Sequence, residues 1–432
     1  MIESHTEHLS GWGKYPSVPT HPRYEARKGH KHIVRGLGRS YGDQAMSPEG
    51  DTVYNAQNNR ILKLDLDKNI IEVESGISLA EILEVLAPKK RFLSVCPGTK
   101  YITVGGAIAN NVHGKSHHVD GEFIDHVLSF ELLSPRGTVY HCSREENKEI
   151  FYASAGGCGL LGHILTARIQ IKTIASTYFD SKAFKARNFD EMLAFLDTEG
   201  IQYDHSVGWI DTTTAQTSGV LVCGNESKIT DATDTIIASQ GDNGLSVPDI
   251  VPGFVLNKLS IKLLNQVIGY QQRRKNGRVH YEPFFFPLDG IHYWNNGYGK
   301  KGFLQFQFVL PLEQGHKNLK TILGWIRNSG CTPFLNVIKR FGLSKARYLS
   351  FPIEGYTLAL DFPVSRKSIL LCKQLSGEIA RMGGRVYLAK DAILEESDFK
   401  SMYPNLPAWL RIREELDPDR ELMSAQALRL GL

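Results

Sequence analysis

Three glycine-rich loops lie within a stretch of about a third of this 432-residue chain. They run over Arg35–Asp43, Pro97–Asn111 and Ala155–Gly162. Glycine admits positive φ and lets the backbone approach a bound group closely. Successive backbone N–H groups in such loops form concave anion-binding sites. The loops therefore predict one extended ligand held along its length, and a pyrophosphate-containing cofactor is the natural candidate.

The first loop superficially matches the dinucleotide fingerprint through Gly36, Gly38 and Gly42. A Rossmann loop opens a helix at once, so that the helix N-terminus faces the pyrophosphate. The stretch that follows here, Gln44–Asp51, is turn-forming. This sequence argues against a Rossmann fold.

Length and composition set broad limits. A chain of 432 residues has room for two domains, and its 42% hydrophobic and 22% charged content is typical of soluble globular proteins. The net charge of +4 is spread along the chain, which suits an anionic substrate but predicts no nucleic-acid partner. Residues 1–15 lack a signal-peptide pattern, and no apolar stretch approaches the ~20 residues that span a bilayer. We expect a cytoplasmic protein.

Hydrophobic patterning predicts an α+β chain. Strands are expected at His32–Gly38, Ile61–Leu66, Ile70–Val73, Asp125–Leu133, Thr138–Cys142, Gly162–Thr173, Phe303–Leu310, Phe334–Lys339, Tyr356–Phe362 and Arg385–Ala389. Helices are expected at Ser78–Leu86, Asn147–Ser154, Ser365–Met382 and, as the terminal helix, Asn405–Leu416. Ser78 and Ser365 are plausible N-caps. The glycine-rich character ends near Ile174–Asn188, where we expect a domain boundary.

Several motifs, taken in order, resemble one enzyme family. They are Arg35–Asp43, Val104–Ala109, His113–His118, Gly302–Phe308, Phe334–Val337, Asp361–Pro363 and Ala389–Asp391. The loops are similar to those of the vanillyl-alcohol oxidase (PCMH) type of FAD enzymes. The whole set resembles the decaprenylphosphoryl-β-D-ribose 2′-oxidases over nearly the full chain. The resemblance implies a two-domain α+β fold, with an FAD-binding domain (1–175), a substrate-binding domain on an antiparallel sheet (176–384) and a C-terminal segment (385–432) completing the FAD domain.

The resemblance also implies a reaction. FAD-dependent oxidation would convert the C2 hydroxyl of a polyprenyl-phosphate pentose to a ketone. An NAD(P)H-dependent short-chain reductase would then complete an epimerisation that gives a D-arabinose donor for cell-envelope glycans. Peripheral contact with the inner face of the membrane is a further expectation. A stand-alone alditol or aldonolactone oxidase is the alternative activity, and an inactive flavin-binding scaffold is a second alternative.

Cofactor contacts follow from the same resemblance. They are Arg35, Gly36, Leu37, Gly38, Arg39, Ser40, Tyr41, Gly42, Pro97, Gly98, Thr99, Val104, Gly105, Gly106, Asn110, Asn111, His113, Gly157, Gly159, Gly162, Ile164 and Tyr387. Many relatives bond a histidine of the first loop covalently to the flavin. Arg39 stands at that position here, so we expect non-covalent FAD.

Lys390, His113 and Tyr41 are the catalytic candidates. Lys390 ends the apolar run Val386–Ala389, and the pattern alone leaves open a strand-end lysine paired with Asp391. The resemblance implies instead an ammonium beside the flavin and the reacting hydroxyl. There it would stabilise developing negative charge or, with its pKa lowered by burial, assist deprotonation.

Substrate contacts are expected from Lys115, Gln305, Gln307, Lys339, Trp209, Phe285 and Thr357. Gln305 and Gln307 alternate with apolar residues and so share one face of a strand, although the pattern leaves open a solvated outer face. Lys339 would bind a phosphodiester or a sugar hydroxyl. Phe285, Thr357 and Ala359 stand where the mycobacterial family member has a tyrosine, an asparagine and a reactive cysteine.

No metal site is expected. The loop His113–His118 contains three histidines, but the spacing of His113 and His117 needs a helix that Gly114 disfavours. The six cysteines form no C-x-x-C pair.

The segment Val247–Tyr270 has a helical apolar period. Its members are Val255, Leu256, Leu259, Leu263, Val267 and Ile268. The pattern is typical either of a helix packed on the substrate domain or of a basic amphipathic segment that rests on lipid or closes over the sugar. We predict that it is mobile or poorly packed without substrate.

Overall fold

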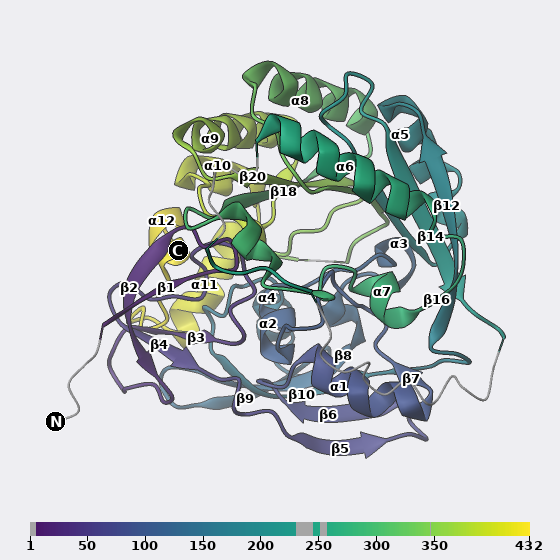
Figure 1. Cartoon of the computed structure of the whole chain (residues 1–432). Coiled ribbons are helices and arrows are strands. Elements are labelled where there is room, and N and C mark those ends of the chain that lie inside the picture. Colours follow the sequence, from purple (N-terminus) through teal and green to yellow (C-terminus); the bar gives the residue numbers. More distant parts are fainter. Residues whose placement is uncertain (1–5, 230–244, 251–256, 346) are drawn as a thin grey trace.

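The computed structural model describes residues 6–229, 245–250, 257–345 and 347–432. Two regions of β-sheet face each other in it, one built mainly from the N-terminal third of the chain and one from the middle (Figure 1). Val255 and Leu256, two members of the predicted apolar face, lie outside the described residues.

The N-terminal region contains two larger sheets and one strand pair. The first has the order β1(Glu7–Ser10), β2(Ser17–Arg23), β4(Asp51–Tyr54), β3(His32–Arg35). The second is antiparallel, with the order β5(Ile61–Asp65), β6(Ile70–Glu74), β10(His163–Gln170), β8(Val127–Leu133), β9(Val139–Ser143). A further pair joins β7(Arg91–Phe92) and β11(Lys172–Thr173). The helices of this region are α1(Leu79–Leu86), α2(Val104–Ala109), α3(His117–Asp120) and α4(Lys148–Ser154).

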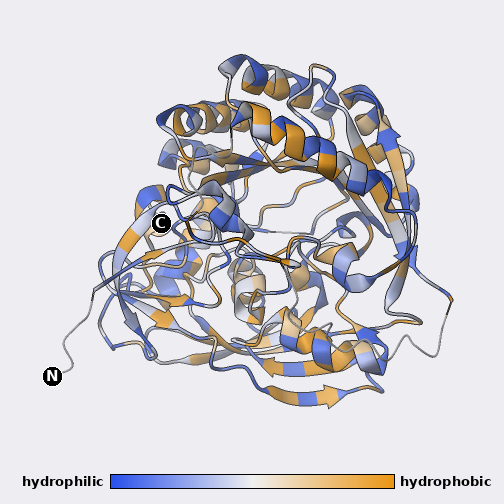
Figure 2. Cartoon of the chain, in the orientation of Figure 1, coloured by the Kyte–Doolittle hydropathy of each residue, from blue (hydrophilic) through white to orange (hydrophobic). Residues whose placement is uncertain are grey.

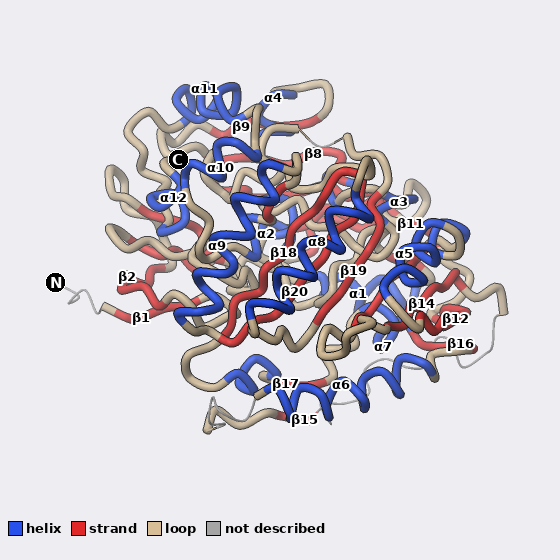
Figure 3. Tube along the Cα trace, turned by 90° about the horizontal axis from the view of Figure 1, so that it is seen from above, coloured by secondary structure: helices blue, strands red, loops and turns tan. Residues whose placement is uncertain are grey.

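The middle of the chain forms an eight-stranded antiparallel sheet. Its order is β16(Gly277–His280), β12(Tyr178–Ala186), β14(Gly219–Glu226), β13(His205–Ile210), β19(Asn336–Phe341), β20(Gly355–Pro363), β18(Phe303–Pro311), β21(Arg385–Val386). Helices α5(Phe189–Asp197), α8(Gly315–Ser329) and α9(Arg366–Arg381) cover its outer side (Figures 1 and 3). The connections contain α6(Lys258–Arg273), α7(Tyr281–Phe285) and the short parallel pair β15(Leu245–Ser246) and β17(Ile291–His292).

The C-terminal segment returns to the N-terminal sheets. Its helices α11(Leu406–Leu416) and α12(Ala425–Leu430) lie near β2–β4 in Figure 1, whereas α10(Glu396–Met402) packs beside α9 and β21. The main chain of His32 bonds to Glu421 and Met423. Arg429 donates to the carboxylate of Asp43, which ends the first glycine-rich loop. The C-terminal segment thus helps to hold that loop in place.

Local signals correctly predicted several elements. Ser78 caps α1 through a reciprocal bond with Glu81, and Ser365 caps α9, which ends before Gly383 in the left-handed region at φ +73°. The predicted hairpin is confirmed as β8 and β9. None of the described helices combines the length and apolarity that crossing a bilayer requires.

Several expectations about elements were wrong. The strand predicted at His32–Gly38 ends at Arg35, where the glycine-rich loop begins. The strand predicted at Gly162–Thr173 ends at Gln170, and the separate short strand β11 follows it. The strand predicted at Arg385–Ala389 ends at Val386, and a 3₁₀ turn, Leu388–Lys390, follows. The strand predicted at Phe334–Lys339 begins two residues later, where pairing with β20 starts. Helix α11 is not terminal, because α12 follows it. The limits at residues 175 and 384 stay a prediction, although β21, beyond the second limit, completes the eight-stranded sheet.

Candidate active site

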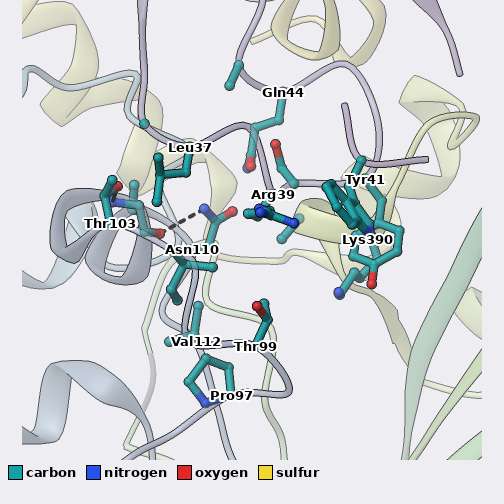
Figure 4. Close-up of a pocket in the computed structure, with 18 of the residues that line it drawn as sticks. Leu37, Arg39, Tyr41, Gln44, Pro97, Thr99, Thr103, Asn110, Val112 and Lys390 are labelled. Carbon is teal, nitrogen blue, oxygen red and sulfur yellow. Dashed lines mark hydrogen bonds between the residues drawn. The ribbon is translucent and has the colours of Figure 1, made fainter. Parts of the chain in front are cut away.

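A cavity of about 320 Å³ lies between the glycine-rich loops and strands β18–β20, within the ~300–1,000 Å³ usual for small-molecule sites. Figure 4 labels side chains from residues 37–44 and 97–112 around it, together with Lys390 from the C-terminal segment. The predicted site residues that line it are Gly36, Leu37, Gly38, Arg39, Ser40, Tyr41, Pro97, Gly98, Thr99, Gly105, Gly106, Asn110, His113, Gly159, Gly162, Ile164, Gln305, Gln307, Lys339, Thr357, Tyr387 and Lys390. Ala359 also lines it.

Five predicted cofactor contacts lie behind the cavity wall. Arg35 points away, with its guanidinium donating to the carbonyls of Ser10 and Ala45. Gly42 packs against the backbone of Asp391, where a Cβ would collide. The other three, Val104, Asn111 and Gly157, are buried supports of the second and third loops.

Three predicted substrate contacts also lie outside the cavity lining. The Lys115 ammonium donates to the main-chain carbonyls of Phe284 and Phe285. The Phe285 ring is itself buried in an aromatic cluster with Phe92. Trp209 is buried on β13 opposite Val337 and packs against α6. Their direct contact with substrate stays a prediction.

Some cavity residues were missed by sequence reasoning. Trp12 stacks on Arg39, with the guanidinium carbon 3.9 Å from its ring centroid. Asp289 accepts a hydrogen bond from the amide of Lys100, and burial raises its pKa. Other cavity-lining residues that were not predicted include Gln44, Thr103, His163 and Trp294. Thr103 lies within the second glycine-rich loop, and Gln44 and His163 directly follow the first and third, so the loops themselves could have indicated these three. Trp12, Asp289 and Trp294 come from stretches that have no such pattern.

Lys390 lies in the C-terminal segment and lines the cavity. Its Nζ lies 3.6 Å from the ring centroid of Tyr41, and the two are adjacent in Figure 4. Burial lowers the pKa of Lys390 to about 7, an effect that Asp361 opposes. The alternative pairing with Asp391 is wrong, because that carboxylate accepts bonds from Arg429 and from main-chain amides.

Asp361 is a fully buried carboxyl group behind this lysine. Its oxygens accept hydrogen bonds from Gln305 Nε2 at 2.7 Å and from the Tyr298 hydroxyl at 3.3 Å. Burial raises its pKa to about 7, while these bonds and the Lys390 charge act the other way. Sequence reasoning placed Asp361 only within a family motif, and the structure shows that its charge acts on Lys390.

His113 is held by a chain of hydrogen bonds from β18. The Thr357 hydroxyl donates to the carbonyl of Phe308, and Gln307 Nε2 donates both to Thr357 Oγ1 and to His113 Nε2, each at 3.1 Å. With Nε2 accepting, the proton of the neutral ring lies on Nδ1. Burial, with lesser contributions from nearby cations, holds the His113 pKa well below its usual range. The ring is therefore a neutral donor.

Both glutamines face the cavity, so the solvated-face alternative for β18 is wrong. Lys339 lies opposite Thr357 in the β19–β20 pair and also lines the cavity. Its Nζ is 3.4 Å from the carbonyl oxygen of Gly114, and burial lowers its pKa to about 8. This end of the cavity thus combines two lysines with amides and a hydroxyl.

The lining fits a long, polar cofactor. Gln44 Nε2, Asn110 Oδ1, His113 Nδ1 and His163 Nε2 are buried and have no hydrogen-bond partner among the described residues. Gly98 and Gly159 line the cavity, and a Cβ at either position would meet no atom within 4 Å. Unpartnered polar groups and open backbone along one cavity suit a flavin dinucleotide, which has hydrogen-bonding groups along its whole length.

Comparisons with known proteins agree with this fit. A family model of the FAD-binding domain matches residues 20–143, and a model of D-arabinono-1,4-lactone oxidase matches residues 300–430. Decaprenylphosphoryl-beta-D-ribose oxidase of Mycolicibacterium smegmatis is 34% identical over 99% of this chain and 98% of its own. An uncharacterized protein of Streptomyces coelicolor is 29% identical over 82% of this chain and its own full length. Bos taurus L-gulonolactone oxidase is 34% identical over 34% of this chain and 33% of its own.

The FAD-binding match covers the first two glycine-rich loops, and the lactone oxidase match covers the strands and the lysine turn that complete the cavity. FAD is therefore the cofactor of this cavity, as predicted. The similarity to the mycobacterial enzyme covers nearly the whole chain, including the residues between the two family-model matches. The chain belongs to the decaprenylphosphoryl-β-D-ribose oxidase family, FAD-dependent oxidoreductases of the vanillyl-alcohol oxidase (PCMH) type that act on CH–OH groups.

Proposed function

We propose that this enzyme oxidises the C2 hydroxyl of a polyprenyl-phosphate-linked pentose to the 2-keto sugar. The observation that carries the proposal is the pairing of Lys390 and Lys339 in one cavity with Gln305 and Gln307. A sugar needs several hydrogen-bonding partners, and a phosphodiester needs a cation. The substrate named for the mycobacterial relative, a decaprenylphosphoryl ribose, has both groups.

FAD supplies the two-electron acceptor. The residues of the chain manage the proton and the charge. With a pKa of about 7, Lys390 is partly unprotonated at neutral pH and can take the proton of the sugar hydroxyl. Once protonated, its ammonium is stabilised by the face of Tyr41 and by the Asp361 carboxylate.

The other polar groups orient substrate and cofactor. The Nδ1–H of neutral His113 points from a fixed ring and can donate without carrying charge. Lys339, whose ammonium lies near the carbonyl of Gly114, binds the phosphodiester. Ala359 and Thr357 leave this end of the cavity without a thiol. These positions distinguish the pocket from the pattern of the mycobacterial relative and bear on which sugar it accepts.

The proposal includes partners. An NAD(P)H-dependent short-chain reductase then reduces the ketone by hydride and proton addition to the C2 alcohol of opposite configuration, which completes an epimerisation to a D-arabinose donor. Because the polyprenyl tail of the substrate lies in a membrane, the enzyme makes peripheral contact with its inner face. The similarity to the mycobacterial oxidase supports this arrangement by analogy.

A lactone or alditol oxidase is the second candidate function. It is favoured by the match of residues 300–430 to D-arabinono-1,4-lactone oxidase. The polar lining at β18 would suit a free polyol as well as a lipid-linked one.

Anaerobic flavin bleaching separates these functions. A short-chain polyprenyl-phosphoryl ribose, an aldonolactone and an alditol would each be mixed with oxygen-free enzyme while the flavin absorbance is followed. We expect rapid bleaching by the phosphoryl ribose, and mass spectrometry should find a product lighter by two hydrogens. Bleaching by the lactone or alditol alone would support the second function. No bleaching by any of the three would contradict catalysis of this class.

A further inference from the structure

Helix α6 presents a row of apolar side chains to solvent. Leu259, Leu263, Val267 and Tyr270 recur at i, i+4, i+8 and i+11, which places them on one face of a helix. They are 68, 56, 54 and 58% exposed. Figure 2 shows orange, hydrophobic bands alternating with blue, hydrophilic bands along this helix. Single exposed apolar residues are ordinary, but a continuous row marks an interaction surface.

The opposite face of α6 packs against the rest of the protein. The apolar row is therefore exposed on a helix that is held in place. Ile261 and Asn265 are each 1% exposed. Asn265 Nδ2 donates to the carboxylate of Asp211 at 2.7 Å. Gly269 packs against Trp209, where a Cβ would lie 3.1 Å from the indole ring.

This seating places α6 beside the substrate end of the cavity. Trp209 pairs with Val337 across β13 and β19, and directly opposed residues project from the same side of a sheet. Val337 and Lys339 line the cavity, so Trp209 and the helix packed on it lie on the cavity side. Figure 3 shows α6 at the rim of the molecule, away from α8 and α9 on the outer side of the sheet.

The charge of this segment is of one sign. From Lys258 to Val279 the sequence contains six lysines and arginines and no aspartate or glutamate. Lys262, Arg273 and Arg274 are among them and are exposed. A helix with an apolar face, basic flanks and no acidic residue has the features of helices that lie in a membrane interface. Docking of a second copy on this face would bring two basic surfaces together.

We propose that α6 docks the enzyme on an anionic lipid surface, with its apolar row in the acyl boundary and its basic residues at the lipid phosphates. Docked in this way, the substrate end of the cavity lies next to the bilayer, where a polyprenyl-phosphate sugar can enter head first. The claim that docking lets a lipid-linked sugar enter the cavity rests on the proposed function. The docking itself depends only on the surface of α6.

Vesicle flotation of the FAD-loaded enzyme tests the proposal. Phosphatidylcholine vesicles with and without phosphatidylglycerol would be compared at low and high salt. We expect binding to the anionic vesicles, weakened by salt. The double variant L263S/V267S should reduce the partition coefficient by about tenfold or more, because two side chains lose their apolar contact with lipid. Leu370→Ser on α9 is the matched control, since Leu370 is 57% exposed, and it should bind as the wild type does.

Three results would overturn the docking surface. They are absence of wild-type binding to anionic vesicles, equal loss in the Leu370→Ser control, and full binding by L263S/V267S. Flavin content and melting temperature establish that each variant is folded. A wild-type dimer that L263S/V267S dissociates, without vesicle binding, would identify a copy of this chain as the occupant instead.

The two proposals fail separately. Bleaching by a soluble short-chain substrate measures chemistry and should be unchanged in L263S/V267S, whose residues lie outside the cavity lining. Vesicle binding without any bleaching would leave the docking surface in place and refute the substrate. Bleaching without vesicle binding would support the proposed substrate and refute the docking surface.

Discussion

The ammonium of Lys390 lies over the ring of Tyr41, 3.6 Å from its centroid, and so joins the C-terminal segment to the first glycine-rich loop. The main chain reinforces this contact, because the Tyr41 amide donates to the Ala389 carbonyl at 2.9 Å. Burial disfavours the charged lysine, whereas the ring and Asp361 favour it. The opposed effects leave the lysine ready to change its protonation near neutral pH.

Replacing this lysine tests its part in the chemistry. Lys390→Ala should keep its FAD and slow substrate-driven bleaching by about 10²-fold or more, the usual scale for losing one charge-stabilising or proton-accepting group. Stopped-flow absorbance gives the rate, and flavin content gives the cofactor occupancy. Lys301→Ala, at an exposed position, is the control and should react as the wild type does. Near-normal bleaching by Lys390→Ala would remove the residue from the mechanism.

The pH dependence of flavin bleaching tests whether Asp361 sets the pKa of Lys390. If Lys390 accepts the proton, bleaching should accelerate as pH rises through the lysine pKa of about 7. Asp361 raises that pKa, so Asp361→Asn should lower it and move the rising limb of the pH profile to lower pH. The limiting rate at high pH should change little. A limb that stays in place would show that Asp361 does not act on Lys390, and a rate that falls with pH would show that the charged lysine is the active form.

Lys339 should affect binding more than chemistry. Lys339→Gln keeps a donor but removes the charge, so the substrate concentration at half-maximal bleaching should rise about tenfold while the limiting rate stays within a few-fold. The comparison substrate is ribose without the phosphodiester. Its bleaching should respond little to the substitution. An equal loss with both substrates would place Lys339 at the sugar instead of the phosphate.

The flavin should be released by acid or heat. Arg39 is stacked on Trp12 at the position where many relatives have the attachment histidine, and a guanidinium forms no such bond. Precipitated protein should be colourless, with FAD recovered in the supernatant and identified by mass spectrometry. Flavin that remains with the protein pellet would contradict this prediction.

Much of the fold could be predicted because the signals are local. The Ser78 and Ser365 caps and the Ser134–Gly137 turn act within a few residues, so the sequence specifies them directly. The 3₁₀ turn that carries Lys390 could not be predicted in this way. Gln426 binds the carbonyl of Leu388 and Tyr41 binds that of Ala389, and these distant partners replace a strand ladder.

In the cavity, too, residues in local sequence patterns could be predicted, whereas residues brought there by distant contacts could not. The glycine-rich loops were recognisable because their composition is unusual over many consecutive residues. Trp12, Asp289 and Trp294 were not, because the fold brings them to the cavity from stretches with no such composition. Lys115 was assigned to the substrate pocket by its place in a motif, yet the carbonyls of α7 bind its ammonium away from the cavity. A motif places a residue near a site, and packing decides which way its side chain points.

Helix α6 offers a last prediction, about local stability. It has the same length as α9, 16 residues, but α9 buries six side chains against the sheet and its neighbours whereas α6 buries only a narrow strip around Ile261 and Asn265. Local opening costs less where fewer apolar contacts are lost. Hydrogen exchange of the substrate-free, lipid-free enzyme should therefore be faster over Lys258–Arg273 than over Arg366–Arg381. Substrate or anionic vesicles should slow exchange in α6 and leave α9 unchanged. Protection of α6 equal to that of α9 in the free enzyme would make it an ordinary part of the core.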